Sequence, residues 1–199
     1  MKHNTRRILK YLVELLIVVF GVFFGVYASE IQSEKRIKRE KEKSINFIVE
    51  ELRGNKERLG NTIKYHKLIR IAIDSIAENL DQEDFFKIYV GNKIFKHSEI
   101  EGWKGVQLAN LESTAFEAAK ISGIVKEYDI GFIRDVSRIY SYQEEYLEFG
   151  NSILKRMINI NSSSKVIDAF SSIELMTYDL VNYEEAIFEE IEKMEMPSD

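Results

Sequence analysis

The sequence predicts an all-α protein in which one N-terminal transmembrane helix continues into a long stalk helix, and a soluble bundle of about four helices follows. Three observations support this fold class. An apolar run lies near the N-terminus, and behind it apolar residues recur at spacings of three and four, the period of a helix. Charged residues of both signs make up 31% of the chain between these apolar positions, which is typical of a folded helical protein and not of a disordered tail.

The apolar run covers residues 11–29 and contains a single charged residue, Glu14. At about 1.5 Å per residue it is just long enough to cross the hydrocarbon of a bilayer. A cleaved signal peptide is the alternative, because residues 1–10 form a basic tail and Val26-Tyr27-Ala28 resembles a cleavage site. The run passes without glycine or proline into residues 31–36, which favours a permanent anchor in contact with membrane lipid.

The orientation of this anchor follows from the charges on its two flanks. Lysine and arginine are frequent on both sides, and counting alone slightly favours a cytoplasmic C-terminal flank. That flank is partly neutralised by glutamates, however, whereas the short tail is purely basic and its outward movement works against the membrane potential, at about 2.3 kcal/mol per charge per 100 mV. We therefore expect a single-pass protein of the cell inner membrane with its domain on the periplasmic or outer side.

Small residues mark one side of the predicted span. Gly21, Gly25 and Ser29 follow one another at intervals of four, a spacing that lets two helix backbones approach closely. Glu14 precedes Gly21 by seven residues and lies on nearly the same side, and a carboxyl group in lipid turns toward a partner, a water path or the headgroups. We expect a homo-oligomer or a membrane protein partner. An ion-handling Glu14, or one that pairs with Lys10, is the alternative.

Two stretches resemble a known group of proteins. The first is Glu14 to Gly25, in which a glutamate, an aliphatic run, a glycine and more aliphatics lead into a charged helix. The second is Ser113 to Gly123, followed by the Tyr-x-x-Gln pattern of Tyr140 to Gln143. Together they resemble a domain-of-unknown-function family of uncharacterised bacterial single-pass membrane proteins. The resemblance implies a bacterial membrane anchor with a helical domain and implies no activity.

The stalk helix is expected over residues 30–80. Its apolar residues fall on one heptad seam, as in a coiled coil, with three polar residues at the remaining seam positions. Gly54 and Gly60 weaken the middle of this helix and allow a bend there. We interpret His66 as a core histidine rather than a metal ligand, because no other histidine has a suitable spacing. The apolar seam is Ile45, Ile48, Leu52, Leu59, Ile69, Ile73, Ile76 and Leu80, and the polar positions are Asn55, Thr62 and His66.

Residues 81–106 lose the helical period and form an irregular or hairpin insert. A hairpin over residues 87–95, with a two-residue turn at Gly91-Asn92, is one interpretation, and a helix from Asp84 to Val90 that ends at Gly91 is the other. The single tryptophan, Trp103, is expected to plug the domain surface or core.

Residues 107–195 are predicted to complete the bundle by packing on the stalk, and 196–199 form a tail. A short helix ends at Ser122-Gly123, and Asp129 caps a long helix that is apolar on two sides and therefore central. A loop over 159–164 precedes the last helix. Its predicted seam is Ile173, Met176, Leu180, Tyr183, Ile187 and Met194.

Composition and motifs limit the classes of function that the chain can have. The chain has no cysteine and a dispersed net charge of -5, which excludes thiolate chemistry and argues against nucleic acid. We find no catalytic set, cofactor motif or metal spacing, and we expect the pairs Glu144-Glu145 and Glu184-Glu185 to be solvated. The sequence thus predicts a membrane-anchored interaction or scaffold protein that is not an enzyme. The alternatives are a sensor bundle with an apolar pocket near Trp103 and Tyr140, and an accessory subunit of an ion-driven complex that uses Glu14.

Overall fold

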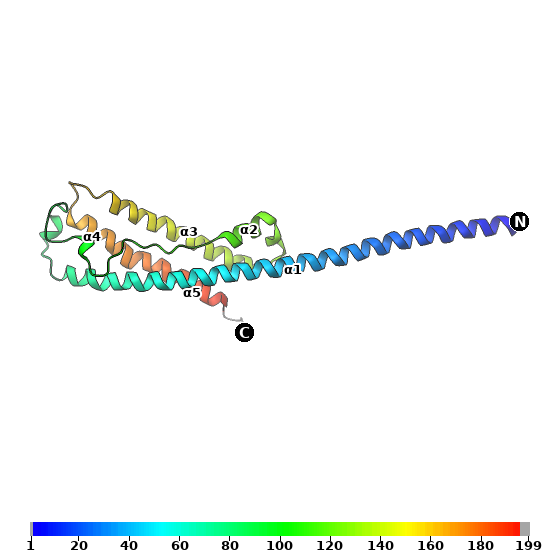
Figure 1. Cartoon of the computed structure of the whole chain (residues 1–199), viewed down its shortest axis with the longest axis horizontal. Helices are drawn as coiled ribbons and strands as arrows, with labels where there is room; N and C mark the ends of the chain where they lie inside the picture. Colours follow the sequence, from blue (N-terminus) through cyan, green and yellow to red (C-terminus); the bar gives the residue numbers. More distant parts are fainter. Residues whose placement is uncertain (1, 196–199) are drawn as a thin grey trace.

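The dominant element of the computed structural model is a single helix, α1, which spans Lys2–Ala77 and contains 76 residues. At 1.5 Å per residue it is roughly 110 Å long. The structure describes the backbone of residues 2–195 and the side chains of residues 11–194, so the predicted tail 196–199 and the side chains of the basic tail lie outside the described residues. The N-terminal half of α1 extends alone, and the other helices pack along its C-terminal half (Figure 1).

The predicted all-α class is confirmed, because no strand occurs in the backbone described from residue 2 to residue 195. After α1 come the short helix α2, Thr114–Ser122, and the long helix α3, Ile130–Ile158. The chain then returns through α4, Val166–Glu174, a π-helical turn over Leu175–Leu180, and α5, Val181–Glu195. These last three segments follow one another without a break and lie antiparallel to α3, between it and α1 (Figure 1).

The core lies where α1, α3 and α5 meet. Their inward rows are fully or almost fully buried, and the stalk seam and the two apolar faces of α3 contribute as their spacing predicts. Such burial contributes about 25 cal/mol per Å² of apolar surface removed from water, which makes this seam the main stabilising feature of the bundle. The buried row of α1 is Ile48, Leu52, Leu59, Ile69 and Ile73, and that of α3 is Val136, Ile139, Tyr140, Tyr146 and Ile153.

The two glycines in the middle of α1 do not interrupt it. The helix continues through Gly54 and Gly60 without a break. A Cβ added at Gly60 would lie 3.4 Å from the Phe188 ring of α5. The missing side chain at Gly60 therefore lets α5 pack closely against α1, and that packing offsets the low helix propensity of glycine.

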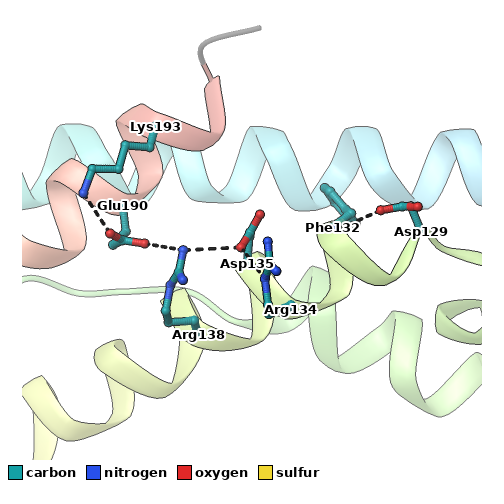
Figure 2. A network of polar contacts seen from close by, with 7 residues as sticks. All are labelled: Asp129, Phe132, Arg134, Asp135, Arg138, Glu190 and Lys193. Atoms are coloured by element: carbon teal, nitrogen blue, oxygen red, sulfur yellow. Dashed lines mark hydrogen bonds and ion pairs between the residues drawn. The ribbon is translucent and has the colours of Figure 1, made fainter. Parts of the chain in front are cut away.

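The predicted helix ends around α2 and α3 are present. Gly123 closes α2 in the left-handed conformation, with φ 74°. The Asp129 carboxylate accepts hydrogen bonds from the backbone N–H of Gly131 at 2.7 Å and of Phe132 at 3.3 Å. Figure 2 shows the bond from Phe132. This cap satisfies two of the orphan donors at the N-terminus of α3.

The predicted hairpin over 87–95 is wrong, and so is the alternative helix ended by Gly91. A short 3₁₀ turn, Asp84–Phe86, is followed by extended backbone. The Asn92 side chain donates to the carbonyls of Ile88 and Tyr89 and accepts from the N–H groups of Ile94 and Phe95, so it occupies the groups that a second strand needs. The Tyr89 N–H instead donates to the Ser164 carbonyl at 2.8 Å, across the loop before α4.

Candidate functional site

The apolar run lies on the unpacked half of α1. Its large side chains from Tyr11 to Tyr27 are between 45% and 68% exposed, and this helix is long and apolar enough to cross a membrane. Gly21, Gly25 and Ser29 are on the same helix as Glu14, away from the bundle. No heavy atom lies within 4 Å of a Cβ added at Gly21 or Gly25, so a second helix has open access to this row.

An extended segment, residues 104–112, is held against α1 and α3 by side chains, and we call it the strap. It belongs to no helix or strand, and it runs beside α1 in Figure 1. The Tyr65 hydroxyl of α1 donates to the Gly105 carbonyl at 2.7 Å and accepts from the Lys104 N–H at 2.9 Å. The Tyr146 hydroxyl of α3 accepts from the Ala109 N–H at 2.7 Å. These contacts replace the ladder that an extended segment otherwise needs.

The C-terminal end of the strap is held by Asn55, which is fully buried. Its amide donates to the Glu112 carbonyl at 2.7 Å, and its Oδ1 accepts from the Glu112 N–H at 2.9 Å. Arg58 donates to Asn55 Oδ1 at 3.0 Å and pairs with the Glu112 carboxylate at 2.5 Å. Asn55, a polar residue on the apolar seam of α1, thus holds the Glu112 backbone by two hydrogen bonds.

The middle of the strap is held by a buried His66–Glu184 pair. The Val106 carbonyl lies 2.7 Å from His66 Nε2, and because a carbonyl can only accept, Nε2 carries a proton. His66 Nδ1 lies 3.1 Å from the Glu184 carboxylate of α5. Both side chains are 0% exposed, so His66 is the core histidine that its position on the seam predicts.

The prediction that Glu184 is solvated is wrong. The predicted seam of the last helix was assigned by apolar character alone and placed Tyr183 in the core. In the structure Tyr183 is 37% exposed and its neighbour Glu184 is fully buried. Two polar residues, Thr177 of the π-helical turn and Glu184 of α5, are fully buried beside apolar residues such as Ile187 and Ile191. A carboxylate is tolerated there because His66 supplies its partner from α1.

Two buried tyrosines, each beside a glutamate, have pKa values well above the ordinary range of tyrosine. Burial, followed by the hydrogen bond to the Glu51 carboxylate at 2.5 Å, raises the pKa of Tyr140. Burial, followed by the charge of Glu184, raises the pKa of Tyr146. Both phenols therefore stay protonated and keep their roles as hydrogen-bonding groups at all physiological pH values.

An ion-pair network joins α3 to α5 (Figure 2). Arg138 lies 2.6 Å from Glu190 and 3.3 Å from Asp135, and Lys193 lies 3.0 Å from Glu190. The hydrogen bond from Lys193, followed by the charge of Arg138, lowers the pKa of Glu190. Arg138 and Lys193 are exposed to solvent, which screens their charges, so the network orients the helices and adds little stability.

Two hollows flank α2. A groove of about 730 Å³ opens between α2 and α1, where Phe47 and Glu51 face Ala115 and Ala118. A smaller cavity of about 280 Å³ lies between α2 and α3. Tyr140 lines this cavity, as the sensor alternative expects, but Trp103 does not line it; the Trp103 ring packs edge-on against His97 with centroids 5.6 Å apart.

No group of three or more histidine, aspartate or glutamate side chains in the described part of the chain is arranged to hold a metal ion. No protein-family model, curated protein or solved structure matches this chain. The resemblance to a family of bacterial single-pass proteins therefore stays a prediction.

Proposed function

We propose that this protein is a membrane-anchored interaction protein of the bacterial inner membrane, with its N-terminus in the cytoplasm and its bundle on the periplasmic or outer side. One observation carries the proposal. The exposed apolar run and the buried seam that builds the bundle are parts of the same uninterrupted helix, α1. Any partner held by the bundle is thereby held at a fixed place relative to the lipid.

The apolar run supports lipid as its surroundings. Its side chains from Tyr11 to Tyr27 point in all directions around α1, and they form a surface far larger than the apolar patches that soluble monomers leave in water. A helix that is apolar all round is stable in a membrane or inside a large core. Within residues 11–29 no part of the bundle covers it.

Self-association of the span is the second part of the proposal. The open row of Gly21, Gly25 and Ser29 lets two α1 helices approach closely, and in lipid such close packing is a main source of helix–helix association. Glu14 lies on the same side, and a partner helix removes its carboxyl group from the acyl chains.

The experiment compares oligomer formation by full-length variants in detergent and in bilayers, using sedimentation and energy transfer between labelled chains. Gly21→Leu with Gly25→Leu blocks the row, and we expect the dissociation constant of the oligomer to rise at least about tenfold, roughly 1.4 kcal/mol. The matched control is Phe23→Leu on the opposite side of α1, which should leave the constant unchanged. Equal association of all three chains, or a monomeric wild type, contradicts the proposed self-association.

The buried polar side chains support a role in binding and not in catalysis, because they hydrogen-bond the backbone of the strap. Four side chains hydrogen-bond the strap backbone, and Glu184 is fully buried beside one of them, His66. The four are Asn55, Tyr65, His66 and Tyr146. Catalytic groups must touch substrate, whereas these side chains are used to hold a segment in place. A sensor role is the second candidate, and the cavity beside Tyr140 favours it.

A further inference from the structure

The segment of α1 that follows the apolar run, residues 30–43, separates its charges by side. Six basic residues and four glutamates leave the whole segment with little net charge. At about 100° per residue, however, four of the basic residues fall within one arc of about 100° and every glutamate falls outside it. We call this arc the basic side. It consists of Lys35, Arg36, Arg39 and Lys43, and the glutamates are Glu30, Glu34, Glu40 and Glu42.

The basic side begins directly beyond the apolar run. Arg36 continues the row of Gly21, Gly25 and Ser29 along the same side of α1. It lies seven residues beyond Ser29, which is about 10 Å along the helix axis. Side chains of a helix lean toward its N-terminus, which here is the direction of the apolar run. The Arg36 guanidinium therefore extends back toward the headgroup layer of a bilayer around the run, a layer roughly 5–8 Å deep.

Hydrogen-bond donors are grouped at the start of the basic side, where five side chains line one hollow on the surface of α1. They are Ser29, Gln32, Ser33, Arg36 and Arg39, and all five can donate. Arg36 lies 4.0 Å from Glu40, and the Arg39 Nε donates to the Lys35 carbonyl at 3.3 Å. Since a guanidinium has five N–H donors, both arginines keep several of them for an anion.

From the charge, the donors and the position of this side we propose that it binds the phosphate of an anionic lipid headgroup. Arg36 and Arg39 donate to the phosphate oxygens, Gln32 donates to a neighbouring headgroup oxygen, and the acyl chains of the same lipid lie along the apolar run. A zwitterionic lipid offers the same phosphate, but the basic side repels its positive group. The inference rests on the proposed anchor, because without a bilayer this side of α1 meets only water and dissolved ions.

The tether makes a modest contact effective. Once the apolar run is in the bilayer, the basic side is held beside the headgroups, so each lipid contact forms at a high effective concentration. Each basic residue near an anionic surface then strengthens binding about fivefold. Two arginines within reach of the headgroups are therefore enough for a clear preference between lipids.

The test is a lipid titration of the full-length protein in detergent micelles, with native mass spectrometry to count the bound lipids. The two probes are phosphatidylglycerol, which is anionic, and phosphatidylcholine, which has the same phosphate and no net charge. We expect phosphatidylglycerol to bind at least about tenfold more tightly. Equal affinity for the two lipids overturns the proposal.

Paired variants locate the lipid on α1. Arg36→Gln with Arg39→Gln removes two charges from the basic side, and we expect the affinity for phosphatidylglycerol to fall at least about tenfold. The matched control is Lys38→Gln with Lys41→Gln, which removes two charges from the same segment on the other side of α1 and should leave this affinity unchanged. Equal weakening by the two pairs shows attraction by net charge alone and overturns the assignment to the basic side.

Two further measurements separate this inference from the anchor and from a dissolved ligand. Inorganic phosphate at millimolar concentration should not displace the lipid, because it lacks the acyl chains; displacement reassigns the basic side to a dissolved anion and overturns the proposal. Flotation of the full-length protein with vesicles of phosphatidylcholine alone tests the anchor. Protein that does not float contradicts the proposed function and this inference with it, whereas protein that floats but shows no preference for phosphatidylglycerol contradicts this inference alone.

Discussion

The strap backbone is hydrogen-bonded by three side chains at points where it would otherwise need water or a neighbouring strand. These side chains belong to Asn55, His66 and Tyr146. Each hydrogen-bonds a strap backbone group, and each is at most marginally exposed. A buried polar side chain with its partners in place costs little, whereas loss of one partner exposes the other to the full desolvation penalty. These residues are therefore points of high sensitivity in an otherwise apolar interface.

His66→Phe removes the donor to the Val106 carbonyl and leaves the Glu184 carboxyl group buried without its partner. We expect the free energy of unfolding to fall by about 3–5 kcal/mol, measured by urea denaturation of the full-length protein in micelles. Glu185→Gln is the control, because Glu185 pairs with Lys67 at the surface and its loss should cost less than about 1 kcal/mol. Similar losses for the two variants would show that the buried pair has no special role.

His97 gives the bundle a dependence on pH. Burial lowers the pKa of His97 below its ordinary value of 6.5, and the Tyr89 hydroxyl lies 2.5 Å from its Nδ1, which accepts only when the ring is neutral. The folded state therefore binds fewer protons than the unfolded chain, so stability is full above pH 6.5 and falls as the pH drops below it. Denaturation midpoints at pH 7.5 and at about pH 5 measure this loss. His97→Gln should show a smaller loss, and an equal loss in both proteins would exclude His97 as its source.

At the residue scale the sequence predicted the apolar positions and the core character of His66, and it missed Glu184. Heptad analysis assigns the most apolar positions to the core, so it predicted that Tyr183 is buried and Glu184 exposed. The decisive fact is a partner on α1 that is 118 residues away in the chain. The same limitation applies to Gln143, which is buried on α3 and accepts from Asn55 of α1, 88 residues away in the chain.

The strap is the element on which the bundle geometry depends. Leu108 of the strap packs on Gly150 of α3 so closely that a Cβ at Gly150 would clash with Leu108 Cδ2. Glycine in the middle of this long helix is thus explained by close approach of another segment and not by flexibility.

Gly150→Ala tests that contact through a double-mutant cycle with Leu108→Ala. In the wild-type chain the new methyl group displaces Leu108, and we expect the free energy of unfolding to fall by about 1 kcal/mol, as overpacking outweighs the gain in helix propensity. In the Leu108→Ala chain the same substitution should raise it by about 1 kcal/mol. Urea denaturation of the four chains gives the coupling, and an additive cycle would contradict the packing of the strap on α3.

At the element scale the long helices and their ends were predictable because periodicity, Gly123 and Asp129 are local signals. The strap and the region around Asn92 were not, because their backbone is satisfied by distant side chains or by one asparagine. Tyr146 and Ala109 are 37 residues apart, and Asn55 and Glu112 are 57 apart. Turn rules describe neighbouring residues and carry no information on such pairings.

Considered whole, the molecule is a rod with a bundle at one end. At the end of the bundle nearer the apolar run, the Tyr128 hydroxyl donates to the Ser44 hydroxyl of α1 at 2.5 Å. Ser44 lies 15 residues beyond Ser29, so a straight α1 places this contact about 22 Å from the end of the apolar run. Charged residues fill that interval, and Arg36 lies 4.0 Å from Glu40, a pairing that supports an exposed helix. The uninterrupted α1 makes this spacing rigid. We therefore expect the bundle to bind a partner at about this distance from the membrane surface.

The central claim is that residues 11–29 hold the bundle at a membrane, and fractionation of cells that produce the full-length protein tests it most directly. We expect the protein to sediment with membranes after an alkaline carbonate wash, to be released by detergent alone, and to retain residues 11–29 when its N-terminus is sequenced. Recovery of the protein in the aqueous fraction, or a mature N-terminus at Ser29, would contradict the account.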